Sequence, residues 1–227
     1  MAKRILKVVL IIFGIVLLLA AGLILWLSVS EFKPADVTDI KIENNSQVGK
    51  FSPFLDQELT VISWNIGYAG LGKDADFFMD GGENVSSYDQ EGVTASLLGI
   101  YKQLYSSDDQ AGIYMLQEVD QNSARTYGMD ERDCLGIYNS AYALNYSCPF
   151  VPYPLPPIGR VNSGLLTTTM YDIDYAERIA LPCPFDWPVS TANLKRCLLV
   201  SYLPIEGSSK KLVIVNLHLE AYDDGEG

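Results

Sequence analysis

Three polar residues of types that can act together on one ligand each follow a short apolar run. These residues are Asn65, Glu118 and His218. In an open α/β sheet, ligands gather at the carboxyl ends of the strands, so the amide, the carboxylate and the imidazole could converge there. Each residue alone has a simpler explanation as a turn former, a solvated charge or a structural histidine. The hypothesis of a shared site therefore depends on the elements that place the three residues.

The first two apolar runs form a strand–helix–strand pattern. Residues 59–64 alternate and are rich in β-branched side chains, which predicts a strand, and residues 112–116 read as a short buried strand. Between them, the spacing predicts a helix over 91–105. Its apolar residues fall on one face: Val93, Leu97, Tyr101 and Leu104. A right-handed crossover with parallel strands is the simplest arrangement of this unit.

Three further strands are predicted later in the chain. They cover 164–169, 197–203 and 211–217, and a hairpin connection joins the last two. The segment 134–160 is expected to be irregular because it contains five prolines. A substrate-facing loop and a surface insertion are equally good interpretations of it. The economical division is one α/β domain over 58–227.

The motifs around the three polar residues, in this order, resemble those of the endonuclease/exonuclease/phosphatase superfamily. The resemblance runs from residue 59 to the end of the chain. The matching segments read LTVISWNIG, YMLQEVD, NSGLLTT, RCLLV and LVIVNLHL, and residues 76–82 and 123–127 also look like bacterial membrane-anchored members. The resemblance implies an α/β fold, a four-layer sandwich with two central sheets flanked by helices.

The resemblance also implies a divalent-metal-dependent phosphodiesterase or phosphatase that uses Mg²⁺ or Mn²⁺. Glu118 would be a metal ligand, Asn65 would assist at the same metal, and His218 would contact the scissile phosphate. These roles suit the residue types, because Mg²⁺ prefers oxygen ligands and often takes one or two carboxylates, with water and substrate phosphate completing its shell. A protonated imidazole can donate to a phosphoryl oxygen as charge builds there.

Substrate binding is expected from residues near the metal ligand. Arg125 and Tyr127 follow the predicted strand end, although an ordinary surface loop is the simpler explanation for both, and Asn162 opens a matching segment. The substrate would be a phosphate ester of a lipid headgroup, a nucleotide or a nucleic acid.

Two motifs that family members use are missing. A later Asp-x-Asn and a final Asp-His pair would be expected, but the chain has one histidine. Its Asp-x-Asn, residues 120–122, directly follows Glu118 and is in the wrong place. We therefore expect a C-terminally truncated sandwich that does not hydrolyse its substrate as it stands. A non-catalytic extracytoplasmic binding module on the same fold is the alternative.

An uninterrupted apolar run at residues 8–27 predicts a membrane-spanning helix, because at ~1.5 Å per residue it covers the ~30 Å hydrocarbon core. Three basic residues precede it, so the positive-inside rule places the N-terminus in the cytoplasm and the domain outside. We expect an anchor at 1–29 and a linker at 30–57. A cleaved signal peptide is the alternative, but its apolar region is usually shorter.

The extracytoplasmic part is strongly acidic. Of 16 Lys and Arg residues, 3 precede the anchor, and the other 13 accompany 28 Asp and Glu, which gives a charge of −15. Such a surface disfavours non-specific binding to nucleic acid.

Four cysteines follow the anchor, and an even number outside the cytoplasm predicts disulfides. The local pairs Cys134–Cys148 and Cys183–Cys197 are the easiest loops to close, and four buried free thiols are the alternative. The spacings and the single histidine do not suit zinc.

Overall fold

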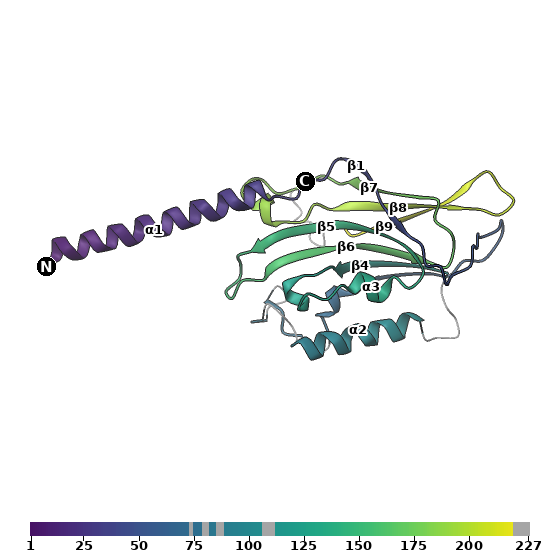
Figure 1. The fold of residues 1–227 in the computed structure, drawn as a ribbon, viewed down its shortest axis with the longest axis horizontal. Coiled ribbons are helices and arrows are strands. Elements are labelled where there is room, and N and C mark those ends of the chain that lie inside the picture. Colours follow the sequence, from purple (N-terminus) through teal and green to yellow (C-terminus); the bar gives the residue numbers. More distant parts are fainter. Residues whose placement is uncertain (73–74, 79–81, 85–88, 106–111, 220–227) are drawn as a thin grey trace, which may run out of the picture.

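The protein is described from a computed structural model, which covers residues 1–227 except 73–74, 79–81, 85–88, 106–111 and 220–227. Part of the family-like segment 76–82 and the acidic tail thus lie outside the described residues. Figure 1 labels the elements. The helices are α1 Ala2–Val29, α2 Gln90–Tyr105 and α3 Glu131–Leu135, with 3₁₀ turns η1 Gly67–Ala69, η3 Ala124–Thr126 and η4 Val189–Ala192. The strands are β1 Val37–Asp39, β2 Ile42–Glu43, β3 Val61–Asn65, β4 Ile113–Asp120, β5 Asn139–Val151, β6 Gly159–Thr169, β7 Tyr175–Ala180, β8 Cys197–Pro204 and β9 Lys211–Leu217.

The strands form two sheets. The five-stranded sheet has the order β2-β5-β6-β4-β3, and the four-stranded sheet has the order β1-β7-β8-β9. The strands β3 and β4 are parallel, with Val61 opposite Ile113, and α2 lies between them in the chain. The predicted parallel strand–helix–strand unit is confirmed.

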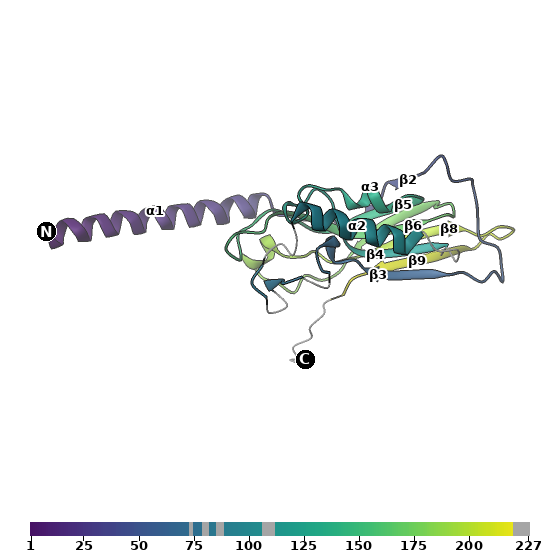
Figure 2. The same cartoon turned by 90° about the horizontal axis from the view of Figure 1, so that it is seen from below.

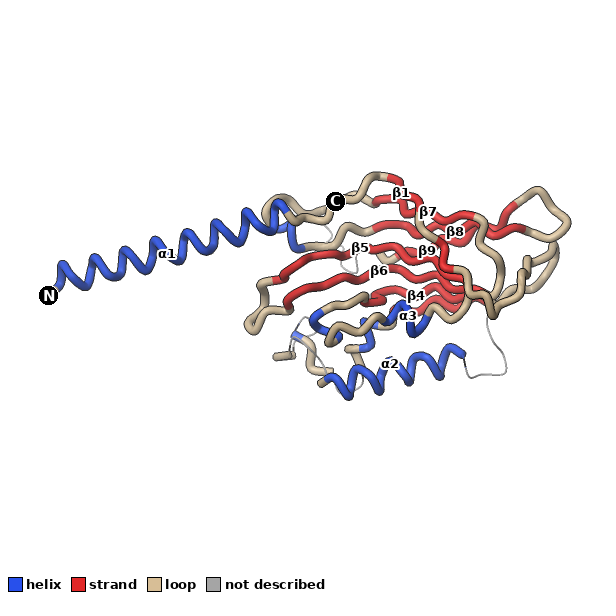
Figure 3. Tube along the Cα trace, viewed as in Figure 1, coloured by secondary structure: helices blue, strands red, loops and turns tan. Residues whose placement is uncertain are grey.

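Two apolar clusters hold the layers together. One lies between the sheets and includes Ala143 of β5, Leu165 of β6 and Leu199 of β8. The other lies between the five-stranded sheet and α2, which contributes Val93 and Leu97. Helices α2 and α3 therefore cover one face of the five-stranded sheet, and the four-stranded sheet covers the other (Figures 1 and 3). The predicted mixed α/β architecture with two sheets is confirmed, and the described residues build three layers of it.

The prediction that 134–160 is irregular is wrong for 139–151, although residues 152–158, with four of the five prolines, lie outside any helix or strand. β5 is a 13-residue strand that contains Pro149. The proline is tolerated because the pairing with β6 shifts register between Cys148 and Val151, and because β2 pairs with β5 only near its start, at Ser140 and Ala141. A proline at a bulge with no neighbour on one side loses no ladder hydrogen bond.

The segment 30–57, for which the sequence predicted a linker, contributes a short strand to each sheet. β1 pairs with β7, and β2 pairs with β5. Each strand has two or three residues, too few for the alternation of apolar side chains that would mark a strand in the sequence.

The predicted disulfides are not formed, and all four cysteines are free thiols. The partners of each expected bridge lie in different surroundings. Cys148 packs in a cluster with Val151, and Cys197 lies between the sheets, while Cys134 and Cys183 are exposed. Burial raises the pKa of the Cys197 thiol to about 11, so this thiol is a poor nucleophile at neutral pH.

The N-terminal helix α1 is long and apolar enough to cross a membrane by its length and composition. A signal sequence near the N-terminus would meet the same description. The side chains before Leu23 are almost all exposed, and the helix extends away from the sheets (Figure 1).

Candidate active site

The candidate site forms where β3, β4 and β9 end. Asn65 is opposite Gln117 in the parallel pair, so the next residue of β4, Glu118, lies beside Asn65. The amide Nδ2 of Asn65 donates to Oε1 of Glu118 at 3.0 Å, and Nε2 of His218 lies 3.7 Å from the same oxygen. The structure therefore brings together the amide, the carboxylate and the imidazole that the sequence singled out.

A bulge in β4 sets the direction of Glu118. The pairing of β4 with β6 shifts register between Leu116 and Val119, and Glu118 has φ +55°. Positive φ is unfavourable for a residue with a Cβ, and such bulges re-aim side chains near functional sites. The bulge leaves the flanking Gln117 and Val119 buried, while the Glu118 side chain stays partly exposed at the sheet edge.

Two buried amides join the sheets directly behind the site. Nε2 of Gln117 donates to Oδ1 of Asn216 at 2.8 Å, and Nδ2 of Asn216 donates to the carbonyls of Leu116 and Leu166, both at 3.1 Å. This pairing fixes β9 of one sheet against β4 of the other. His218, two residues after Asn216, is thereby held opposite Glu118.

The structure gives Asn65 an orienting role toward the carboxylate. Its Oδ1 accepts the backbone N–H of Gly67 at 3.0 Å, so its Nδ2 points at Glu118. A fixed amide that donates to the carboxylate limits the rotation of that carboxylate, as partners of metal ligands commonly do.

The Arg125 guanidinium is held by the protein itself. Its Nε and Nη2 donate to the two carboxylate oxygens of Asp120, both at 2.8 Å, and its Cζ lies 3.6 Å from the centre of the Tyr68 ring. Asp120 is completely buried. This bidentate, stacked arrangement occupies the Nε–Nη2 edge of the guanidinium, one of the edges that could bind a phosphate.

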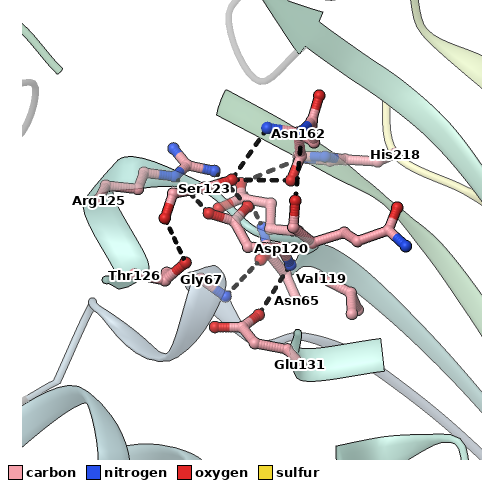
Figure 4. Close-up of polar contacts among 12 residues, drawn as sticks. Asn65, Gly67, Val119, Asp120, Ser123, Arg125, Thr126, Glu131, Asn162 and His218 are labelled. Carbon is pink, nitrogen blue, oxygen red and sulfur yellow. Dashed lines mark hydrogen bonds and ion pairs between the residues drawn. The ribbon is translucent and has the colours of Figure 1, made fainter. Parts of the chain in front are cut away.

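Asn162 and Tyr127 are the other two predicted substrate residues. The side chain of Asn162 accepts from Oγ of Ser147 at 2.8 Å and donates to the carbonyl of Gln121 at 3.3 Å. Its backbone also exchanges hydrogen bonds with Ser123 (Figure 4). Tyr127 is 45% exposed in the left-handed turn after η3.

Glu131, the first residue of α3, is buried next to Asp120, whose backbone N–H it accepts at 2.8 Å (Figure 4). Burial, followed by the charge of Asp120, raises the pKa of Glu131 well above its usual value. The folded state therefore binds this proton more tightly than the unfolded chain does.

We expect Glu131→Gln to reduce the pH dependence of stability. Because the folded-state pKa is raised, the stability that the protonated carboxyl contributes is present below the unfolded pKa and is lost as pH rises through the folded pKa. Gln keeps an acceptor for Asp120 and cannot ionise. Urea unfolding measures the free energy of unfolding at mildly acidic and at mildly alkaline pH. This free energy should fall more between the two pH values for the wild type than for the variant. An equal fall in both proteins would contradict the raised pKa.

The residues at the site fit a divalent cation that takes one protein carboxylate. Glu118 supplies that carboxylate from a partly exposed position, which leaves room for water and a phosphate ligand. Within the described part of the chain, no group of three or more His, Cys, Asp or Glu residues could hold a metal by itself. A separate pocket of about 350 Å³ opens beside Asn65 toward α2, but neither Glu118 nor His218 lines it.

Sequence reasoning missed the residues that support the site. Gln117 and Asn216 belonged to recognised motifs but received no role, although their spacing before Glu118 and His218 was visible. Asp120, two residues after Glu118, could have been found as a partner for Arg125. Glu131 carried no such signal, because its burial depends on α3 packing against β4.

Comparison with known proteins gives one structural similarity. No family model matches the chain, and no curated protein matches it. The chain is similar to a solved structure described as the crystal structure of endonuclease/exonuclease/phosphatase from Beutenbergia cavernae DSM 12333, with 17% identity and a TM-score of 0.40. The match covers 71% of this chain and 38% of that chain.

Proposed function

We propose that the chain belongs to a divalent-metal-dependent phosphoesterase that acts on the outer face of a membrane. The observation that carries the proposal is the meeting of Asn65, Glu118 and His218 at the ends of three strands from two sheets. The substrate is a phosphate ester, which includes lipid headgroups, nucleotides and nucleic acid. The acidic surface disfavours long nucleic acid among these.

Each residue of the proposed site has a separate role. Glu118 would hold Mg²⁺ or Mn²⁺, and Asn65 would keep the carboxylate in position. The cation, when bound, supplies positive charge to a phosphoryl oxygen. His218 in its protonated form donates to a phosphate oxygen and stabilises the charge that builds there. Arg125 positions the strand end through Asp120.

The proposal includes the membrane topology and the full sandwich. The basic residues before α1 favour a cytoplasmic N-terminus, and the length of the apolar run favours an uncleaved anchor. A fourth layer of helices would cover the outer face of the four-stranded sheet, where β9 exposes Val213, Val215 and Leu217.

A non-catalytic binding module is the second candidate. The observation that favours it is that no group of three or more His, Cys, Asp or Glu residues in the described ranges could hold a metal. Such a site could bind a metal–phosphate ligand without activating water.

One assay separates the two candidates. The longest polypeptide that the gene encodes is incubated with bis(4-nitrophenyl) phosphate, with Mg²⁺ and with EDTA. We expect hydrolysis that requires the metal. Metal binding without hydrolysis would favour the module, and a protein that neither binds Mg²⁺ nor hydrolyses the ester would contradict both.

A further inference from the structure

The last turns of α1 are packed against the sheets. Leu27 is 5% exposed, and Leu23 and Leu27 join a cluster that includes Val151 of β5 and Val161 of β6. The helix is therefore seated on the end of the sandwich where β5 leads into β6, and its direction relative to the sheets is set by apolar contacts.

Aromatic residues strengthen this junction. The indole Nε1 of Trp187 donates to Oγ of Ser28 at 2.9 Å, one residue after the apolar run of α1 ends. On the same turn, the ring of Trp26 lies 6.4 Å from that of Phe150. Trp187 must then lie at the same level as the end of the apolar run, which is where a spanning helix leaves the hydrocarbon.

The side chains around the junction present an exposed apolar surface, here called the seating surface. It consists of Tyr153 and Leu155 from the β5–β6 connection and Trp187 and Val189 from the β7–β8 connection. Their exposed fractions are 69%, 85%, 64% and 55%. Helix α1 contacts both β5 and η4, in or next to which these side chains lie along the chain. Exposed apolar side chains near one another mark interaction sites, and Trp and Tyr are enriched at membrane interfaces.

Glu31, the first acidic residue after α1, is neutralised. Glu31 pairs with Lys195 at 2.8 Å and with Lys33 at 3.1 Å, and 7% of its side chain is exposed. Burial opposes ionisation, but the hydrogen bonds from these two lysines lower the pKa of Glu31 overall.

The candidate site lies at the same end of the sandwich. Val161 of β6 packs in the cluster that holds α1, and the next residue, Asn162, is bonded to Ser123, three residues after β4 ends. The paired strands also place Ser163 opposite Asp120. Figures 1 and 2 show α1 leaving from the end toward which β4 and β5 run.

We propose that the seating surface rests in the interfacial layer of the membrane that α1 crosses, and so holds the candidate site at the bilayer surface. The inference depends on the proposed anchoring of α1 and is independent of the proposed hydrolysis. The partner of the seating surface is a lipid bilayer, because the surface is continuous with the helix that would enter the bilayer.

The test uses the three tryptophans of the chain: Trp26 in α1, Trp187 on the seating surface and Trp64 in β3, which packs under α2. Three variants each keep one tryptophan and replace the other two with Phe. The full chain is reconstituted in phosphatidylcholine vesicles, with and without phosphatidylcholine brominated high on the acyl chain. We expect Trp187 to lose a fraction of its fluorescence comparable to that of Trp26, and Trp64 to lose none.

The outcomes separate the inference from the proposals on which it depends. Quenching of Trp26 without quenching of Trp187 overturns the seating surface and leaves the anchor in place. Quenching of neither overturns both and leaves metal-dependent hydrolysis untouched. If a variant fails to fold, the unaltered protein still decides, because two of its three tryptophans should be quenchable if the surface is seated and one if it is not.

Discussion

Glu118→Gln should lower the affinity for Mg²⁺ or Mn²⁺ by at least about a hundredfold, since loss of a mere outer partner of a ligand already costs about 10–100-fold. The substitution keeps the size of the side chain and removes its charge. The carboxylate of Asp120, two residues further along β4, is already paired with Arg125, so we expect it not to replace that of Glu118. Isothermal titration of the metal into the full chain measures the effect.

A second substitution at the same position separates metal binding from folding. Glu118 has φ +55°, which disfavours any residue with a Cβ by roughly 1–2 kcal/mol. Glu118→Gly should therefore lose the metal as Glu118→Gln does, while its free energy of unfolding stays equal or rises. Retained metal affinity in both variants would reject Glu118 as the ligand. A less stable Gly variant would show that the bulge needs the side chain.

Asp120→Ala should lower the free energy of unfolding by about 3–5 kcal/mol, the cost of leaving a buried charge without its partner. Asp120 is completely buried and accepts two hydrogen bonds from Arg125, which would keep its charge without a counterion. Replacing both residues, Asp120→Ala with Arg125→Met, should recover part of the loss because no charge then remains. Urea unfolding measures all three variants.

The matched control is the exposed pair between Lys211 and Asp174, whose side chains are 46% and 45% exposed. Asp174→Ala should cost no more than about 1 kcal/mol, as exposed pairs do. An Asp120→Ala variant as stable as Asp174→Ala would show that the guanidinium of Arg125 does not depend on Asp120. Arg125 would then be available to a substrate, as the sequence predicted.

The elements that could be predicted from sequence are those whose signal is local. The alternation before Asn65 and the helical spacing from Val93 to Leu104 depend on residues close together in the chain, and both elements are present. The proline-containing strand β5 was missed because its tolerance of Pro149 depends on which strands lie beside it. The same reason hid β1 and β2, which are strands only because β7 and β5 offer them an edge.

The candidate site likewise has features that could be predicted from the sequence and features that could not. Its three central residues were visible because each ends a recognisable strand. The bulge that aims Glu118, and the ion pair that occupies Arg125, depend on pairing with β6 and on burial under Tyr68. Residue type alone suggests phosphate binding for any basic residue near such a site, Arg125 included. Only the packed structure reveals that its partner is Asp120.

The amide pair between Gln117 and Asn216 has a consequence for the order of assembly. The two residues are 99 positions apart, and contacts of such separation form late because a long loop must close first. A chain that emerges from its N-terminus would complete β3, α2 and β4, with Glu118 already at the sheet edge, well before β9 arrives. The imidazole of His218 then joins the site in the step that docks the second sheet. In a chain whose folding stalls before that step, Glu118 is in place but His218 is not yet beside it.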